Sequence, residues 1–259
     1  MADEDGFITV PKRKGFKSKN LPAKTDSIQA VQSPIFDSQG FLRKIKRCQD
    51  ELVSSDFLRD FWDSFGQPID RQILTIICYA LGNFSECKIS QYQLGLLIIL
   101  QETLKAQVEI FDPVFSEKEK DILQNLNFKV IEVNTEGKHK VEQLTLFYLP
   151  HSPKELVNNI LFANWQKELL ANCVFVSNSF DNIFLKTPAK ILDKNFSFIS
   201  RISSLYKEKE IKNSFRFKDI FNDTSVHTFP SVNLNSCTAD FWESREEPTY
   251  SESEEFKRG

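Results

Sequence analysis

Short apolar segments alternate with segments of helical periodicity along most of this chain, and this alternation limits the possible folds more than any other feature of the sequence. Each apolar segment has the length of one strand, and five of them lie at residues 73–81, 108–111, 129–134, 144–149 and 173–178. Buried strands that alternate with helices are typical of a mostly parallel sheet with helices on both faces. The sequence therefore predicts a single Rossmann-like α/β domain, with a candidate last strand at 224–229.

The helices expected between these strands are marked by periodicity and by capping residues. Apolar residues at helical spacing predict one or two helices at 38–65 and another at 90–105. A capping box or a hydroxyl residue before proline marks three further helix starts: Ser116 with Glu119, Ser152 with Pro153, and Thr187 with Pro188. We expect the last two of these helices to run to about residue 170 and to Leu205.

One connection is too short to hold a crossover helix. Only nine residues, 135–143, separate the strands predicted at 129–134 and 144–149. The two strands could form an antiparallel hairpin, or the nine residues could cross the sheet without a helix, because they reach roughly 30 Å when extended. We favour the crossing loop, since in a sheet of order 3-2-1-4-5 the step from the third to the fourth strand needs roughly 20 to 25 Å.

The two ends of the chain differ from its middle in composition, although the net charge of the whole chain is only −3. Residues 1–33 have a small basic surplus and few large apolar groups, and residues 246–259 are mainly acidic. Such segments bury too little apolar surface to offset the entropy lost on ordering, so we predict two disordered tails. Between them we expect a helical N-terminal extension at 34–66 and the α/β domain at 67–245.

Several features bear on the compartment. No apolar run approaches the roughly 18 residues of a membrane-spanning helix, and the acidic N-terminus lacks the apolar stretch of a signal peptide. The five cysteines are widely spaced and form no CxxC pair, which favours reduced thiols over disulfides or a zinc site. We therefore expect a cytoplasmic protein that contacts no membrane. The basic run PKRKGFKSK at 11–19 could also direct nuclear import, although such runs are more often simply solvated.

Several longer motifs occur in the same order as in one known family: CYALGNFSEC at 78–87 followed by YQLGLLIIL, DPVFSEKE at 112–119, NTEGK at 134–138, TLFYLPHSP at 145–153, NNILFANW at 158–165, SNSF at 177–180 and FNDTSVHTFP at 221–230. Over roughly residues 70–245 the chain resembles the SRR1 family, named for reduced sensitivity to red light. The family usually has glycine at the positions of Ala80 and Ser177 and cysteine at that of Ser152.

The resemblance implies a broad role. It implies a regulatory protein tied to circadian clock gene expression, to light signalling in plants and, in animals, to the control of haem biosynthesis. Such a protein would act through protein partners or a small ligand. The resemblance implies no particular reaction.

Polar residues follow the predicted strands at the edge where open α/β sheets bind ligands, outside the carboxyl ends of the strands. They are Gly82 and Asn83 after the first strand, Asp112 after the second, Asn134 after the third, His151 after the fourth, and Asn178 and Ser179 after the fifth. An acid after the second strand is where dinucleotide and S-adenosylmethionine proteins of this topology hold ribose hydroxyls, and Gly82 would let the backbone approach a ligand. Asp112 before Pro113 also fits a helix-entry turn.

These positions give two candidate sites. Gly82, Asn83, Asp112 and Asn134 are the candidate residues for binding S-adenosylmethionine or another adenosine-containing cofactor. His151 is the candidate catalytic residue, since a histidine beside a helix start could act as a general acid or base. A histidine that bonds a local backbone carbonyl is the simpler interpretation when no partner residue is in view.

Other patterns narrow the functional classes. The chain has no GxSxG, P-loop or Cys–His pattern of common hydrolases and phosphoryl-transfer enzymes, and no ligand-spaced group predicts a metal or haem site. The predicted core has no basic, aromatic face, so we do not expect nucleic acid as a partner. Two functions stay open: a regulatory protein that acts through protein partners or a small ligand, and an S-adenosylmethionine-dependent methyltransferase-like or other nucleotide-cofactor enzyme.

Overall fold

The computed structural model describes residues 37–65, 72–243 and 245–250. Within these residues a sheet of seven strands has the order β3-β2-β1-β4-β5-β7-β6. The strands are β1 (Thr75–Tyr79), β2 (Gln107–Phe111), β3 (Phe128–Val130), β4 (Thr145–Leu149), β5 (Cys173–Asn178), β6 (Lys207–Glu210) and β7 (Thr224–Thr228). The first five are parallel, while β7 pairs antiparallel with both β5 and β6. The predicted α/β class and the 3-2-1-4-5 order are therefore confirmed.

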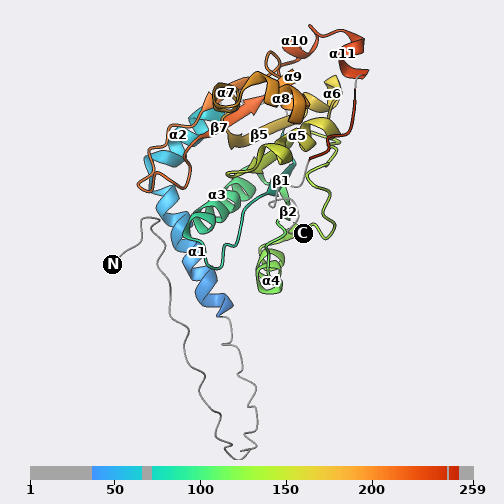
Figure 1. The fold of residues 1–259 in the computed structure, drawn as a ribbon. Coiled ribbons are helices and arrows are strands. Elements are labelled where there is room, and N and C mark those ends of the chain that lie inside the picture. The colour runs from blue at the N-terminus through green and yellow to red at the C-terminus, as the bar shows by residue number, and fades with distance from the viewer. Residues whose placement is uncertain (1–36, 66–71, 244, 251–259) are drawn as a thin grey trace, which may run out of the picture. The chain divides into compact units, whose positions relative to one another are not determined.

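Helices cover both faces of this sheet, as Figure 1 shows. One face packs against α1 (Ser38–Val53), α2 (Asp56–Phe65), α3 (Lys88–Leu104) and α4 (Glu117–Asn125). The other face packs against α5 (Lys154–Ala163), α6 (Lys167–Leu170), α7 (Phe180–Lys186), α8 (Ala189–Asn195) and α9 (Ser197–Arg201), with α10 (Ser231–Leu234) and α11 (Ala239–Glu243) at its border. No helix of the described residues is long and apolar enough to cross a membrane.

The central strand β1 separates two hydrophobic cores. Ile76 and Cys78 point into the core shared with α1 and α3, whereas Ile77 and Tyr79 point into the core shared with α5. All four side chains are buried, which is the pattern of a parallel strand covered on both faces. The predicted N-terminal extension contributes α1 and α2, whose apolar residues belong to the first of these cores.

The connection from β3 to β4 crosses the sheet without a helix. These strands are not neighbours, because β2 and β1 lie between them, so the antiparallel hairpin considered from the sequence is excluded. The loop packs closely on α5: Gly137 is buried with φ 78°, and a Cβ there would lie 2.4 Å from Leu156 Cδ1. Glycine is required at this position both by its left-handed backbone and by this contact.

Buried asparagines of α5 and its C-terminus hold the crossing loop. Asn159 Nδ2 donates to the carbonyl of Glu136 at 2.8 Å, and Asn164 Nδ2 donates to the carbonyl of His139 at 2.8 Å. Asn164 Oδ1 also accepts from the Val141 N–H at 2.8 Å. The asparagines of the NNILFANW motif therefore satisfy backbone groups of a loop that has no strand partners of its own.

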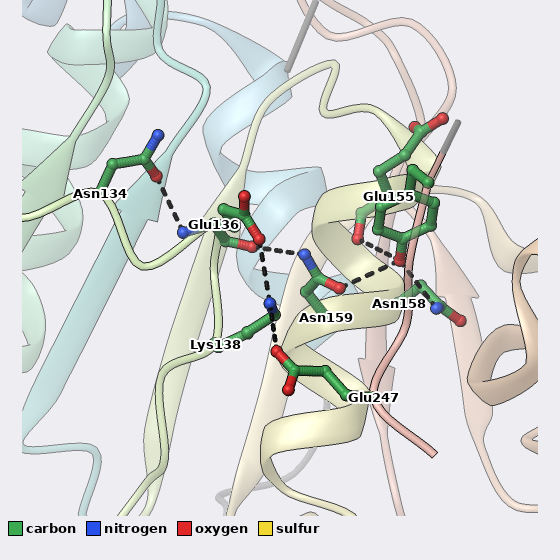
Figure 2. A network of polar contacts seen from close by, with 8 residues as sticks. Asn134, Glu136, Lys138, Glu155, Asn158, Asn159 and Glu247 are labelled. Carbon is green, nitrogen blue, oxygen red and sulfur yellow. Dashed lines mark hydrogen bonds and ion pairs between the residues drawn. The ribbon is translucent and has the colours of Figure 1, made fainter. Parts of the chain in front are cut away.

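Residues 245–250, here called the C-terminal strap, differ from the prediction of an acidic tail beginning at residue 246. The Tyr250 hydroxyl accepts from Asn158 Nδ2 at 2.9 Å and lies 3.0 Å from Asn159 Oδ1. Lys138 Nζ bridges Glu136 and Glu247 at 3.0 and 2.6 Å (Figure 2). The strap is thus tied to α5 and to the crossing loop. The predicted tail at 1–33 and residues 251–259 lie outside the described residues.

Candidate functional site

Two acids that follow β2 hold the loop that follows β1. The Gly82 N–H donates to Asp112 Oδ2 at 2.8 Å, and the Ser85 N–H donates to Glu119 Oε1 at 2.9 Å. Glu119 Oε2 also accepts from the backbone of Ser116 and completes the predicted capping box of α4. The motifs GNFSEC and DPVFSEKE therefore form one hydrogen-bonded unit at the carboxyl edge of the sheet.

Asp112 uses both carboxylate oxygens within this unit. Oδ1 accepts from the Val114 N–H at 3.1 Å, in addition to the bond from Gly82 to Oδ2. Burial raises the pKa of Asp112, and the two backbone N–H groups act in the opposite direction. The predicted helix-entry role is thus present, and a ribose hydroxyl at this position would have to share acceptors that the backbone already occupies.

The side chains of the other predicted site residues do not take part in the Gly82–Asp112 hydrogen bond. Asn83 Oδ1 accepts from Ser85 Oγ at 2.8 Å, and the exposed Asn134 accepts from the Glu136 N–H at 2.8 Å, so both side chains form local turns. His151 is exposed with φ 51° in the turn after β4. Among the described residues, a hydrogen bond joins Gly82 to Asp112, but none joins either of them to Asn134 or His151.

A pocket of about 210 Å³ lies where β4 and β5 end. Its walls come from the turn before α5, from the end of β5, from α7 and from the turn before β7. The lining residues are Ser152, Pro153, Lys154, Asn178, Asn182, Ile183, Lys186, Thr187 and Asp223. Ligands of open α/β sheets bind at this edge, so we define these residues as the β4/β5 pocket.

Two polar atoms of the β4/β5 pocket have no partner within the described part of the chain. Ser152 Oγ and Asn178 Oδ1 are both buried, and neither forms a hydrogen bond there. Buried polar atoms are nearly always satisfied by protein, water or ligand, since an unpaired one costs roughly 1 to 3 kcal/mol. The acid of the pocket, Asp223, accepts a hydrogen bond from the Asn182 amide. The pocket therefore offers two unpartnered neutral polar atoms, beside the charged side chains of Lys154 and Lys186 in its lining.

A buried Ser–His–Glu series lies behind the pocket, on β5, β7 and β6. His227 Nδ1 lies 3.5 Å from Ser177 Oγ, and His227 Nε2 lies 3.2 Å from Glu208 Oε2. The same order of residue types serves nucleophilic catalysis in hydrolases. Here Ser177 and His227 are 1% and 0% exposed, and the Phe180 ring stacks on the imidazole with 3.8 Å between ring centroids. A substrate cannot reach this serine, so the series is structural.

The charges of this series are set by burial and hydrogen bonding. Burial acts to raise the pKa of Glu208, but hydrogen bonds from His227, from Ser179 and from the Asp181 N–H outweigh it and lower the pKa to about 2. Burial lowers the pKa of His227, although Glu208 acts against that shift. Glu208 is therefore an ionised carboxylate that accepts hydrogen bonds from β7, from α7 and from the N-cap residue of α7.

Sequence reasoning named Asn178 at the pocket but missed most of its lining and the whole buried series. The pocket residues are spread from position 152 to position 223, and all except Asn178 of β5 belong to turns or helices whose direction the sequence does not specify. The buried series left one usable signal: Ser177 directly follows the apolar run CVFV of β5, whereas β7, with the sequence TSVHT, gives no such contrast around His227. A buried polar side chain in such a strand needs a partner, which predicts contact with another polar residue.

The fold and this edge define an α/β protein of Rossmann-like topology with a small polar pocket at the carboxyl ends of its strands. The model of the SRR1 domain matches residues 44–228. The chain therefore belongs to the SRR1 family, and the resemblance read from its motifs is confirmed.

Curated relatives agree with this assignment. The chain is 29% identical to an SRR1-like protein of Drosophila melanogaster, over 92% of this chain and 88% of that protein. It is 26% identical to an SRR1-like protein of Mus musculus, over 77% and 94% of the two chains. It is also 26% identical to the Arabidopsis thaliana protein SENSITIVITY TO RED LIGHT REDUCED 1, over 70% and 71%. No solved structure matches the chain significantly.

Proposed function

We propose that this chain is a regulatory protein that binds a small ligand in the β4/β5 pocket and passes the bound state on to protein partners. The name of the plant relative, which refers to sensitivity to red light, supports a regulatory role. The finer role in the proposal is the one that family resemblance implies, in circadian gene expression and in the control of haem biosynthesis. The proposed place of action is the cytoplasm, with the nucleus as a second compartment.

The observation that carries this proposal is the pair of unpartnered polar atoms, Ser152 Oγ and Asn178 Oδ1, in a pocket at the ligand-binding edge of the sheet. The acids near this edge act differently, because Asp112 and Glu119 accept hydrogen bonds from backbone of the chain itself. The Ser–His–Glu series is closed to substrate. Binding is therefore better supported than catalysis.

A ligand screen with matched variants tests the proposal. The melting temperature of the full chain is measured with phosphorylated metabolites, S-adenosylmethionine, nicotinamide and flavin cofactors, and haem. Asn178→Ala removes a pocket amide, and Asn195→Ala removes an exposed amide at the end of α8. We expect at least one compound to stabilise the wild type and Asn195→Ala, and to stabilise Asn178→Ala less. If no compound stabilises the wild type, or if the two variants respond alike, the pocket is not the binding site.

The second candidate function is a methyltransferase-like or other nucleotide-cofactor enzyme. It is favoured by the Gly82–Asp112 pair, which lies at the carboxyl ends of neighbouring central strands where related topologies hold a ribose. Calorimetric titration with S-adenosylmethionine tests it. For an enzyme of this class, Asp112→Asn should lower the affinity at least about tenfold, as expected for the loss of a charge-assisted hydrogen bond. Asp121→Asn, on the exposed face of α4, is the control. If S-adenosylmethionine does not bind, this candidate is removed and the regulatory proposal remains.

A further inference from the structure

The ligand class of the β4/β5 pocket follows from its charge, its neutral groups and its size. We propose that it recognises a small phosphate-bearing molecule that also carries a hydroxyl group. This inference rests on the proposed ligand-binding function and gives it a chemical class.

Two lysines make the pocket cationic. Lys154 and Lys186 line it from α5 and α7, and neither forms an ion pair with any described residue. The opposing charge in the lining is Asp223, whose Oδ1 already accepts from the Asn182 amide. The lining therefore has one positive charge in excess, and its lysines are available to an anion.

The position of Lys154 at the start of α5 also favours a phosphate-bearing ligand. It is the first residue of α5, a helix of ten residues whose N-cap is Pro153 and provides no side-chain hydrogen bond. The first backbone N–H groups of a helix favour an anion, and a cation in the first turn opposes the helix dipole. Lys154 thus opposes the helix dipole in a turn where the neighbouring Glu155 favours it, and a bound phosphate would add a second favourable charge.

The two unpartnered atoms fit the remainder of such a molecule. Both atoms are inaccessible to solvent, so a ligand reaches them only after each side chain rotates toward the pocket. The Ser152 hydroxyl can then donate to a phosphate oxygen, and Asn178 Oδ1 can accept from a ligand hydroxyl. The volume of about 210 Å³ is below the roughly 300 Å³ at which pockets for drug-sized ligands begin. A monophosphate of a small polyol or sugar fits this volume better than a dinucleotide does.

Ribose 5-phosphate, ribose and inorganic phosphate are the probes for a calorimetric titration of the full chain. Lys186→Gln and Lys154→Gln remove the pocket cations, and Lys190→Gln removes an exposed cation of α8 as a matched control. We expect ribose 5-phosphate to bind more tightly than ribose or phosphate, with an affinity that falls as salt increases. Lys186→Gln and Lys154→Gln should each weaken binding at least about tenfold, whereas Lys190→Gln leaves it unchanged.

A second measurement separates binding from a structural role of the lysines. Without ligand, Lys154→Gln should keep or slightly raise the melting temperature, because it removes a cation from the first turn of α5. If ribose binds as tightly as ribose 5-phosphate, or if Lys186→Gln behaves like Lys190→Gln, the phosphate inference is overturned. If an uncharged compound of the screen binds the wild type but not Asn178→Ala, the proposed ligand-binding function is supported and the phosphate inference is wrong. If no probe and no screened compound binds, both the proposed ligand-binding function and the phosphate inference are wrong.

Discussion

At the residue scale, the backbone after β1 is strained in a way that the sequence only partly reveals. Ala80 has φ 59°, in the left-handed region that costs a residue with a Cβ roughly 1 to 2 kcal/mol. The SRR1 family usually has glycine here, and the left-handed backbone explains that preference in physical terms. Ala80 lies two residues before Gly82, whose N–H donates to Asp112.

Ala80→Gly should therefore stabilise the protein. Relief of the left-handed strain exceeds the roughly 0.5 to 1 kcal/mol that glycine loses through the entropy of the unfolded chain, so we expect a net gain of up to about 1 kcal/mol. Urea unfolding gives the free energy. Ala189→Gly, at the exposed start of α8, is the control and should instead lower stability. A loss of stability in Ala80→Gly would mean that contacts of the Ala80 methyl group outweigh the strain.

Glu208 should make the stability of the protein depend on pH on the acid side. Its pKa in the folded protein is about 2, against 4.5 as the ordinary value, so the unfolded chain binds the proton more readily. The stabilisation is complete above about pH 5.5 and is lost as the pH falls through 4.5 toward 2. His227, whose pKa is also lowered, adds a loss that begins below its ordinary value of 6.5.

Urea unfolding at about pH 7 and about pH 4 measures this effect. Between these values the wild type should lose about 1 kcal/mol more than Glu208→Gln, which has no carboxylate to protonate. Glu142→Gln, in an exposed loop, is the matched variant and should lose as much as the wild type. Equal losses in the wild type and Glu208→Gln would show that the carboxylate is not held at a lowered pKa.

At the scale of elements, the sequence predicted the strands well where they are apolar and poorly where they are not. β6 has the sequence KEKE and was missed, because its pairing with β7 at the sheet edge needs no apolar side chain. Charged edge strands of this kind also discourage pairing with other chains. The helix predicted to run to Leu205 is broken at Phe196, whose φ of −136° ends α8 and precedes α9. Apolar residues recur at helical spacing through both α8 and α9, so the sequence pattern does not show the break at Phe196.

The C-terminal strap is the element whose prediction changed most. Composition indicated an acidic tail, but the Tyr250 hydroxyl contacts buried asparagines of α5, and Glu247 forms an ion pair with Lys138. Tyr250→Phe should lower the free energy of unfolding by roughly 1 to 3 kcal/mol, because Asn158 and Asn159 each lose a buried partner. The exposed Thr249 provides the control, since Thr249→Ala should change stability by less than about 0.5 kcal/mol.

Thermal and urea unfolding of both variants check this prediction. If Tyr250→Phe is as stable as Thr249→Ala, water replaces the hydroxyl at no cost and the strap is only loosely held. A chain that ends after residue 250 should keep the stability of the full chain, whereas one that ends after residue 243 should lose at least as much as Tyr250→Phe.

At the scale of the whole molecule, the sheet order and the crossing loop could be predicted, because the extended length of the loop can be compared with the distance between strands. The pocket could not be predicted in this way. The order depends on chain lengths that the sequence contains. The pocket depends on where four separate turns and helices place nine side chains, and local patterns do not determine that. The candidate residues Gly82 and Asp112 form a structural pair, while two unsatisfied polar atoms, Ser152 Oγ and Asn178 Oδ1, belong to the pocket at the ends of β4 and β5.

The two-faced burial of β1 gives the most general prediction. Ile76 and Ile77 are 0% and 1% exposed and belong to different cores, so an aspartate at either position buries an unpaired charge. Ile76→Asp and Ile77→Asp should each abolish soluble expression, since the cost exceeds the few kcal/mol by which most domains are stable. Leu74→Asp, one residue before the strand and 42% exposed, should express normally. Soluble, folded protein from either isoleucine variant would mean that one face of the central strand meets solvent, and the layered core would then be wrong.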